Sequence, residues 1–532
     1  MLDLIHITIP EMILIAAACA LFFLGCSKRP AVRAVIPFLA LAALLAALIV
    51  TVYAFFSDQL EIDTLSGSLR VDNLARFIRL LATCVGVILL LLAWPTRRDY
   101  TGNSALRFGG DGGEFYALFL LSITGLLLTA VADDLIVLFL ALELVSIPTY
   151  VMVSISRRIP AAQEAAVKYF FLGALSIAIM LFGFSYLYGT TGHIHFAQMS
   201  AVFQSTLHAA GTLPAWQMLA IILTVIGFAY KMAAFPLHFY AGDVYEGAAT
   251  PVTAFLAFVP KTAGFVALIR LLQVVGGDTF AVPTQLTTFL AVLAAITMFV
   301  GNVLALLQQN IKRILAYSSI AHTGYMLVGI TALTSTRSLQ LLGLPTARDT
   351  ALAGVLFYLA AYGLMNSAAF GVLMLLPSRS SPDDSAETFS DIASQGRRHI
   401  ALGLAMAVSC FSLIGIPLTV GFLGKVMLIR PAFSASLAWL AILLIINAAI
   451  SASYYLHIVA SMFLRSESPG IEQVPTPAPI AMQPQFPVAL GIFLSVATTI
   501  AFGAVPPAIT TLTYGAEMGA QAIVAAPPVT RR

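Results

Sequence analysis

The chain has 532 residues, of which 60% are hydrophobic and only 10% are charged. Ordinary soluble domains carry about a quarter charged residues, so this composition excludes a water-soluble fold. The formal net charge of +3 is small and the basic residues are scattered, which excludes a nucleic-acid groove and a polybasic lipid-binding arm. The four cysteines show no CxxC or Cys/His spacing, so we expect them to be inert packing residues.

Unbroken apolar runs of about twenty residues dominate the chain, and this is the length of a transmembrane helix. A membrane β-barrel would instead show strands of about ten residues with alternating polarity. The sequence therefore predicts an all-α membrane protein embedded in a lipid bilayer, with about fourteen transmembrane helices. In chain order we expect these spans near residues 8–25, 34–56, 73–94, 114–132, 134–154, 163–188, 214–240, 250–274, 283–307, 312–333, 350–376, 400–429, 434–463 and 487–510.

The basic residues of the loops are unevenly distributed. Loops after odd-numbered spans hold fourteen lysines and arginines, whereas loops after even-numbered spans hold seven, with Arg79 and Arg270 among them. By the positive-inside rule, the odd-numbered loops are cytoplasmic. Both termini are then expected on the periplasmic side of a bacterial cytoplasmic (inner) membrane, which agrees with an even number of spans.

In two of the expected spans, a proline close to a lysine is expected to break the helix. Pro236 follows Lys231 inside the seventh span, and Pro417 precedes Lys425 inside the twelfth. Proline removes a helical hydrogen bond and clashes with the preceding turn, so we expect both helices to be broken. Broken helices at corresponding positions of two repeats are typical of a transport site.

The distance between the two broken spans predicts two inverted five-helix repeats, formed by spans four to eight and nine to thirteen. The repeats divide the chain into four units. These are three N-terminal transmembrane helices at 1–110, the first repeat at 111–275, the second repeat at 276–465, and the last transmembrane helix with the C-terminal tail at 466–532.

Five charged residues are expected inside the spans: Glu143, Lys168, Lys231, Lys261 and Lys425. A charge near the bilayer centre costs about 2.5–3.5 kcal/mol, so each of them needs a reason. Low dielectric disfavours the charged form of lysine and glutamate, whereas a nearby opposite charge favours it. A Glu143–Lys231 pair would hold both charges when close and let the lysine release its proton when separated. This behaviour predicts a proton relay.

The alternative to a relay is a structural role, in which the lysines extend to the membrane interface or form ion pairs only to fix helix packing. It applies most strongly to Lys168, which lies five residues into its span. His238 and His322 are candidate bridges between the charged groups, since histidine titrates near neutrality and passes a proton between its two nitrogens. For both histidines, ordinary hydrogen-bonded packing is the alternative. There is no Walker motif, dinucleotide fingerprint or metal-ligand spacing, so energy for pumping must come from elsewhere.

Four stretches in order carry a recognisable pattern. They are EAAVKYFFLGALS at 164–176, AFPLHFYAGDVYEGAATPVTAFLAFVPKTAGFVALIRL at 234–271, QQNIKRILAYSSIAHTGYMLVGI at 308–330 and FSLIGIPLTVGFLGKVMLI at 411–429. From about residue 114 to 465, the chain resembles the antiporter-like proton-pumping subunits of respiratory complex I, the NADH:quinone oxidoreductase. It is most similar to the subunit N branch, because subunit M typically has glutamate where Lys425 stands and we expect no lateral helix like that of subunit L after span fourteen.

The resemblance implies that Glu143 and Lys231 form the switching ion pair, that Lys261 is the central relay and that Lys425 is the terminal proton site. It implies no cofactor in this chain; FMN, iron–sulfur clusters and quinone would lie on partner subunits. The partners would be a neighbouring antiporter-like subunit and small membrane subunits of complex I. Quinone reduction elsewhere in the complex would drive the protons.

Two other functions stay open at this point. A subunit of a multi-subunit cation/proton antiporter would share the fold and the ion pair, and a structural membrane scaffold would use the buried charges only for assembly. For the relay, we expect a hydrated polar axis in the order Glu143, Lys231, Lys261, His322 and Lys425. Neighbouring members should lie roughly 4–10 Å apart, within the reach of one or two bridging waters.

Overall fold

The computed structural model describes residues 8–27, 29–56, 62–63, 68–95, 112–157, 159–335, 347–376, 386–465 and 486–521. Within these residues the chain is mainly helical, and two short strands, β1 (Ile62–Asp63) and β2 (Arg70–Val71), form one antiparallel hairpin. The expected boundary at 110–111 and the tail after residue 521 lie outside the described residues. Several basic residues counted in the loops, including Arg97, Arg98 and Arg107, also lie outside them.

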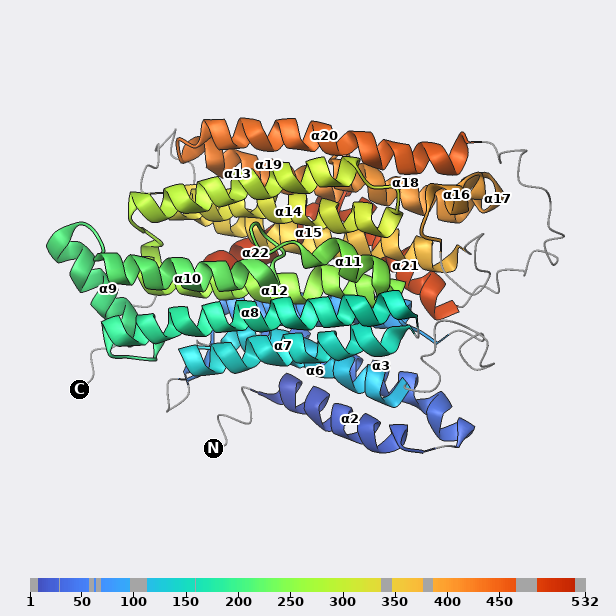
Figure 1. The fold of residues 1–532 in the computed structure, drawn as a ribbon, viewed down its shortest axis with the longest axis horizontal. Coiled ribbons are helices and arrows are strands. Elements are labelled where there is room, and N and C mark those ends of the chain that lie inside the picture. The colour runs from blue at the N-terminus through green and yellow to red at the C-terminus, as the bar shows by residue number, and fades with distance from the viewer. Residues whose placement is uncertain are drawn as a thin grey trace.

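Most helices of the first half of the chain lie side by side with their long axes in a common direction (Figure 1). They begin and end close to the apolar runs, since an apolar run of spanning length must satisfy its backbone internally. Their bounds are α2 (Ile9–Gly25), α3 (Pro30–Phe56), α4 (Asn73–Leu92), α6 (Gly112–Val131), α7 (Leu135–Ser156), α8 (Pro160–Thr191), α9 (Phe196–Ala210), α10 (Ala215–Lys231), α11 (Tyr240–Gly247) and α12 (Thr250–Gly276).

The second half continues the same arrangement, with α20 at the edge of the molecule opposite α2 (Figure 1). A single 3₁₀ turn among the described residues, η1 (Gly277–Thr279), follows α12. The helices are α13 (Thr284–Leu306), α14 (Ile311–Thr334), α15 (Ala347–Leu375), α16 (Phe389–Ile392), α17 (Gln395–Arg398), α18 (Ile400–Ile414), α19 (Val420–Ser434), α20 (Ala438–Phe463), α21 (Phe486–Ala504) and α22 (Pro506–Gln521).

Ten helices of the described part are long and apolar enough to cross a membrane, or eleven if the pair formed by 389–398 and 400–414, bent by 118°, counts as one span. Two shorter apolar helices, α2 and α10, fall below that length. The chain is thus a multi-pass membrane protein, and fourteen spans stays a prediction. Several helices lie outside the predicted spans: α9, between the sixth and seventh, α16 and α17, between the eleventh and twelfth, and most of α11 and α22.

The core lies around α12 and α15, whose apolar windows are entirely buried inside the protein. By contrast, α8 and α20 bury only a third of theirs, and they expose apolar side chains such as Phe171 and Ile446. Helices that are apolar all round belong in the centre, whereas those exposing apolar faces lie against lipid or a partner. The central helices therefore hold any charged group away from lipid.

Two helices end where proline prevents their continuation. Helix α10 ends at Lys231, and Pro236 lies in the following segment, where its ring would clash with the carbonyl of Met232 in a continued helix. Helix α18 ends at Ile414; Gly415 then adopts a left-handed conformation with φ of 89°, and Pro417 follows. Both ends leave backbone carbonyls without helical partners near a lysine.

Candidate functional site

A buried ion pair joins α7 to the last residue of α10. Lys231 Nζ lies 2.9 Å from Glu143 Oε1 and donates to Ser146 Oγ at 2.5 Å. Ser146 follows Glu143 by three residues, so both side chains lie on one face of α7. Lys231 is 4% exposed and Glu143 8% exposed. The pair therefore has little water around it, and each charge depends on the other.

Four tyrosines pack together next to this ion pair, and one of them, Tyr230, directly precedes Lys231. The rings of Tyr169 and Tyr240 stack with centroids 5.1 Å apart, and Tyr150 meets Tyr169 edge-on at 4.6 Å. The hydroxyl of Tyr230 donates to the carbonyl of Tyr169 at 2.7 Å, and that of Tyr240 donates to the carbonyl of Tyr230 at 2.9 Å. Tyrosine offers apolar area with one polar atom, so this group excludes water while keeping polar atoms close to the pair.

Lys261, on α12, binds uncharged oxygens. Its Nζ donates to the carbonyl and the hydroxyl of Ser319 at 2.5 and 2.6 Å and to Thr323 Oγ1 at 2.8 Å, and it lies 5.1 Å from the centre of the Tyr362 ring. These three oxygens match the three hydrogens of the ammonium group. Among the described residues, no carboxylate forms an ion pair with Lys261.

Thr323 connects Lys261 to the end of α10. Its hydroxyl accepts from Lys261 and donates to the carbonyl of Met232 at 2.7 Å, one residue beyond Lys231. The close approach of the helices depends on Gly264, since a Cβ there would lie 2.7 Å from Met232 Cγ and 3.1 Å from Lys231 Cβ. The end of α10 and the middle of α12 are therefore joined by a hydrogen-bonded route.

His322, on α14, lies between Lys261 and Lys425. Its Nδ1 is 2.7 Å from the hydroxyl of Tyr358, and its Nε2 is 3.2 Å from that of Tyr455. The Tyr455 hydroxyl also makes a short contact with Ser318 Oγ. The His322 ring is 5.2 Å from the ring of Tyr362, which also faces Lys261. Both imidazole nitrogens thus have a hydroxyl with which to exchange a proton.

Lys425, on α19, binds the carbonyls freed at the end of α18. Its Nζ donates to the carbonyls of Leu413 and Ile414 at 3.0 and 2.6 Å. A cation at the C-terminal carbonyls of a helix is favourable, because those groups carry the negative end of the helix dipole. The ammonium also lies 5.0 Å from the centre of the Tyr325 ring, and that ring is 5.3 Å from His322. Tyr325 therefore lies near both Lys425 and His322.

The structure places the two remaining candidates away from these contacts. Lys168 is 44% exposed at its side chain and pairs with Glu164 and Asp243, each at 2.7 Å. His238 lies between α10 and α11, is 2% exposed, and its ring is 4.5 Å from that of Phe239 and 5.8 Å from that of Phe235. Lys168 thus belongs to a separate ionic group, and His238 lies against aromatic rings.

Sequence reasoning wrongly assigned two buried arginines to loops. Arg79 lies within α4, is 6% exposed, and its Nη2 is 2.6 Å from Oε1 of Glu11, on α2. Arg270 lies within α12, is fully buried, and donates to both carboxylate oxygens of Asp72 at 2.5 and 2.9 Å. A count of loop charges treats every arginine near a span end as a loop residue, although a carboxylate on a neighbouring helix can draw the arginine inward.

Glu11 was also missed, because the sequence indicated Glu143 as the only deep carboxylate, and Glu11 is 1% exposed. Asp72 precedes α4 and accepts from the backbone N–H of Ala75, so it also caps that helix. Burial raises the pKa of Asp72, but the charges of Arg270 and Arg70 outweigh burial and hold the pKa below its ordinary value. Within the described residues, there is no group of three or more His, Cys, Asp or Glu side chains that could hold a metal ion.

The fold and the buried row of charges define the class to which the protein belongs. Residues 132–451 match the family described as NADH:quinone oxidoreductase/Mrp antiporter, transmembrane. The NADH-quinone oxidoreductase subunit N of Trichlorobacter lovleyi is 35% identical over 95% of each chain. The chain therefore belongs to the family of NADH-quinone oxidoreductase subunit N.

Two solved structures agree with this assignment. A chain of respiratory complex I from Thermus thermophilus is 29% identical, with a TM-score of 0.72 over 94% of this chain and 97% of that one. A chain of the Mrp complex from Dietzia sp. has a TM-score of 0.75 over 99% of this chain and all of that one, but only 18% identity. The second likeness shows the shared fold and nothing more.

Proposed function

We propose that the chain is a proton-translocating membrane subunit of an NADH:quinone oxidoreductase and that protons pass along the row Glu143, Lys231, Lys261, His322 and Lys425. The environment of Lys261 carries this proposal. An ammonium group that is 2% exposed and bound to hydroxyl and carbonyl oxygens bears its charge without a nearby carboxylate among the described residues. Such a group gains and releases a proton at lower cost than one locked to an acid.

The Glu143–Lys231 pair would act as the switch. When the two side chains are in contact, each stabilises the charge of the other, and separation leaves Lys231 as a lone ammonium in low dielectric, which favours release of its proton. That proton would pass from Lys231 to Thr323 through water, and the Thr323 hydroxyl, which is bound to Lys261, would deliver it; the carbonyl of Met232 only accepts from Thr323 and orients its hydroxyl. Rotation of a hydroxyl allows the same group to accept and then donate.

His322 and Lys425 would complete the transfer. The histidine has a tyrosine hydroxyl at each nitrogen, so it can take a proton at one nitrogen and release one at the other. Lys425 would be the terminal site, with its charge held by the two carbonyls at the end of α18. Waters in the gaps between these groups would bridge distances that direct hydrogen bonds do not cover.

We further propose fourteen spans and two inverted repeats, at 111–275 and 276–465, flanked by units at 1–110 and 466–532. In this arrangement α10 with α11 and α18 with α19 are the halves of two broken spans. The lysines at the two breaks support this pairing, although Lys231 ends α10 whereas Lys425 lies in the helix after its break. They would therefore not be symmetry mates.

The proposed setting is a bacterial cytoplasmic membrane with both termini on the periplasmic side. The partners would be a neighbouring antiporter-like subunit and small membrane subunits, and the exposed apolar faces of α8 and α20 would be covered by lipid or by these partners. FMN, iron–sulfur clusters and quinone would lie on partner subunits, with no cofactor in this chain. Quinone reduction on those subunits would supply the energy.

The decisive test replaces Lys261 with alanine in the intact complex. Membrane vesicles carrying Lys261→Ala should oxidise NADH with a lowered number of protons moved per electron, while the subunit content stays equal to that of the parent. An Arg465→Met variant, which removes an exposed cation from the end of α20, is the matched control and should pump normally. Full pumping by assembled Lys261→Ala complexes would overturn the proposal and favour a scaffold.

A further inference from the structure

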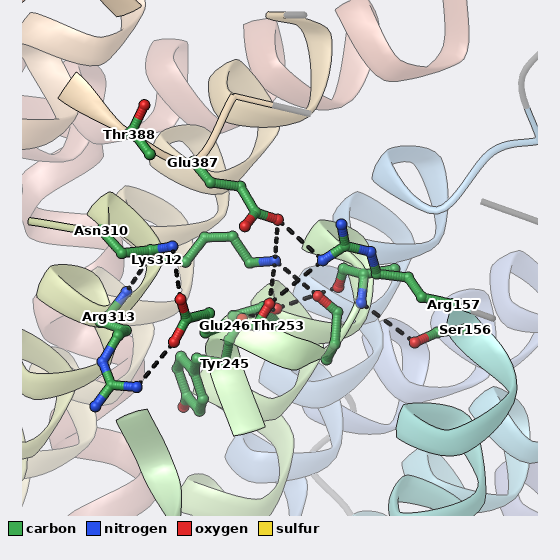
Figure 2. Close-up of polar contacts among 12 residues, drawn as sticks. Ser156, Arg157, Tyr245, Glu246, Thr253, Asn310, Lys312, Arg313, Glu387 and Thr388 are labelled. Atoms are coloured by element: carbon green, nitrogen blue, oxygen red, sulfur yellow. Dashed lines mark hydrogen bonds and ion pairs between the residues drawn. The ribbon is translucent and has the colours of Figure 1, made fainter. Parts of the chain in front are cut away.

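A group of charged residues surrounds the C-terminal end of the short helix α11. Glu387 Oε1 lies 3.0 Å from Arg157 Nη1 and 3.0 Å from Lys312 Nζ, and thus connects two cations from distant parts of the chain (Figure 2). Arg157 follows α7, Lys312 lies in the first turn of α14, and Glu387 precedes α16. We call Arg157, Lys312 and Glu387 the clamp.

The clamp holds the backbone of α11 directly. Lys312 Nζ donates to the carbonyls of Glu246 and Ala248 at 2.9 and 2.7 Å, and Arg157 Nη1 lies 3.4 Å from the carbonyl of Glu246 (Figure 2). These carbonyls stand at the C-terminal end of α11, where a helix presents unsatisfied acceptors and a partial negative charge. Lys312 is fully buried and Arg157 is 5% exposed, so little water weakens these bonds.

The acidic side chains of α11 are also tied to neighbouring helices. Arg313, next to Lys312, donates to Asp243 and Glu246 at 2.8 Å each, and Lys168 of α8 binds Asp243 at 2.7 Å. Helix α11 is therefore held by cations from α8 and α14 as well as by the clamp. Eight residues make only about two turns, too few for independent stability, so these bonds decide where α11 lies.

The opposite end of α11 reaches the buried ion pair. Tyr240, its first residue, donates to the carbonyl of Tyr230, which directly precedes Lys231. Tight packing closes the sides of the helix. A Cβ on Gly242 would lie 2.7 Å from the Tyr317 hydroxyl, and one on Gly247 would lie 2.6 Å from Ala165 Cβ. The helix therefore extends from the Glu143–Lys231 region to the clamp and packs against α8 and α14 on the way.

We propose that Lys312 and Glu387 are positioning residues that hold α11 closed over the buried row, so that protons reach Lys231 and Lys261 from the clamp end only when α11 moves. This inference rests on the proposed relay. A lysine bound to two carbonyls and one carboxylate fixes the end of α11 in a single position. Removal of its charge would leave two carbonyls and Glu387 without that donor, and α11 would occupy open positions more often.

The test measures passive proton flow in vesicles that contain the whole complex without substrate. Lys312→Met keeps the length of the side chain and removes its charge, and Glu387→Gln removes the acid while keeping a hydrogen-bonding amide. An imposed pH gradient should collapse at least about tenfold faster with Lys312→Met, as expected for the loss of charge-assisted hydrogen bonds, and faster than the parent with Glu387→Gln. Lys312→Arg should remain tight, and so should the Arg465→Met control.

A second substitution separates this proposal from the relay itself. If the leak passes along the relay, then Lys312→Met combined with Lys261→Ala should return to the parental rate. If Lys312→Met and Glu387→Gln, each tested alone at parental subunit content, both gave tight vesicles, the gate would be overturned and the relay would be unaffected. A leak that persists when Lys312→Met is combined with Lys261→Ala would also overturn the gate, because protons would then bypass Lys261. Should Lys261→Ala alone pump fully, the relay rather than the clamp would be at fault.

Discussion

The charges in the middle of the protein differ from those near its ends in what neutralises them. Near the ends of the protein, cations form ion pairs with carboxylates: Arg270 with Asp72, Arg79 with Glu11, and Lys312 with Glu387. In the middle, Lys261 and Lys425 bind carbonyls, hydroxyls and ring faces, and neither forms an ion pair within the part of the chain that the structure describes. Lys231 combines the two arrangements, since it lies in the middle of the protein but forms an ion pair with Glu143.

We propose that this difference separates structural charges from those that carry protons. A cation bound to a carboxylate keeps its proton, and breaking such a buried pair is costly because one charge is left alone. A lysine held by neutral oxygens loses those hydrogen bonds on deprotonation but leaves no charge behind. End charges should therefore govern stability and position, and middle charges should govern pumping. The following predictions test this division, beginning with the largest expected effect.

Lys231→Ala should have the largest effect on pumping. The substitution leaves Glu143 as a buried carboxylate without its cation, so both quinone reductase activity and proton translocation should fall roughly tenfold or more. Simultaneous measurement of NADH oxidation and acidification in vesicles checks this. The comparison variant is Lys168→Ala, in the exposed group with Glu164 and Asp243, which should retain most of the activity. Equal losses of pumping in Lys231→Ala and Lys168→Ala would show that the buried pair matters no more for pumping than the exposed group does.

Glu143 should tolerate a change of length better than a change of charge. Glu143→Gln removes the negative charge that Lys231 needs and should lower pumping strongly, whereas Glu143→Asp should keep part of it. Ser146, at 2.5 Å from Lys231 Nζ, would help to hold the lysine near a shorter acid. The two variants should be compared in membranes with the same subunit content. Indistinguishable activities would favour a packing role for Glu143.

Thr323→Val should have an intermediate effect. Valine has nearly the same shape but lacks the hydroxyl that lies between Lys261 and the carbonyl of Met232. Loss of one such hydrogen bond corresponds to about 1 kcal/mol, so the pumping rate should fall by roughly fivefold. Thr323→Ser, which keeps the hydroxyl, should restore most of the rate. A valine variant that pumps as well as the serine variant would show that the route does not pass Thr323.

Asp72→Asn should change stability and leave pumping almost unaffected. It breaks a buried pair with Arg270 and should destabilise the folded subunit by roughly 3 kcal/mol, measured by thermal unfolding of the purified complex. Because the pKa of Asp72 is lowered in the folded protein, this stabilisation is present above the unfolded pKa. It is lost only as the pH falls through the lower, folded pKa. A stability difference that disappears near neutral pH would contradict this.

The sequence was a good guide to the identity of the central charges. Glu143, Lys231, Lys261 and Lys425 stand out because each is a charge in an apolar run, and such charges are rare enough to demand a reason. The two helix ends near Pro236 and Pro417 were predictable for the same kind of reason, since proline acts locally on the backbone. Hydropathy also located the ten or eleven membrane-crossing helices of the described part, while the count of fourteen spans is still a prediction.

The partners of these charges were not predictable. The hydroxyls of Ser319, Thr323, Tyr358 and Tyr455 reach the lysine and histidine positions only through packing of α14, α15 and α20 against α12 and α19. A serine or tyrosine in a span is common, so its presence alone indicates little. The same limit explains why Arg79 and Arg270 were assigned to loops, since their carboxylates lie on other helices.

The most direct test of the central claim is Lys261→Arg. Arginine keeps the positive charge but does not release its proton under these conditions, so it separates a charge that titrates from one that is only present. We expect assembled Lys261→Arg complexes to move fewer protons per electron, as Lys261→Ala does, while Lys312→Arg in the clamp pumps normally. The measurement is the ratio of protons moved to NADH oxidised in sealed vesicles. A parental ratio in Lys261→Arg would contradict the account, because Lys261 would then serve only as a fixed charge.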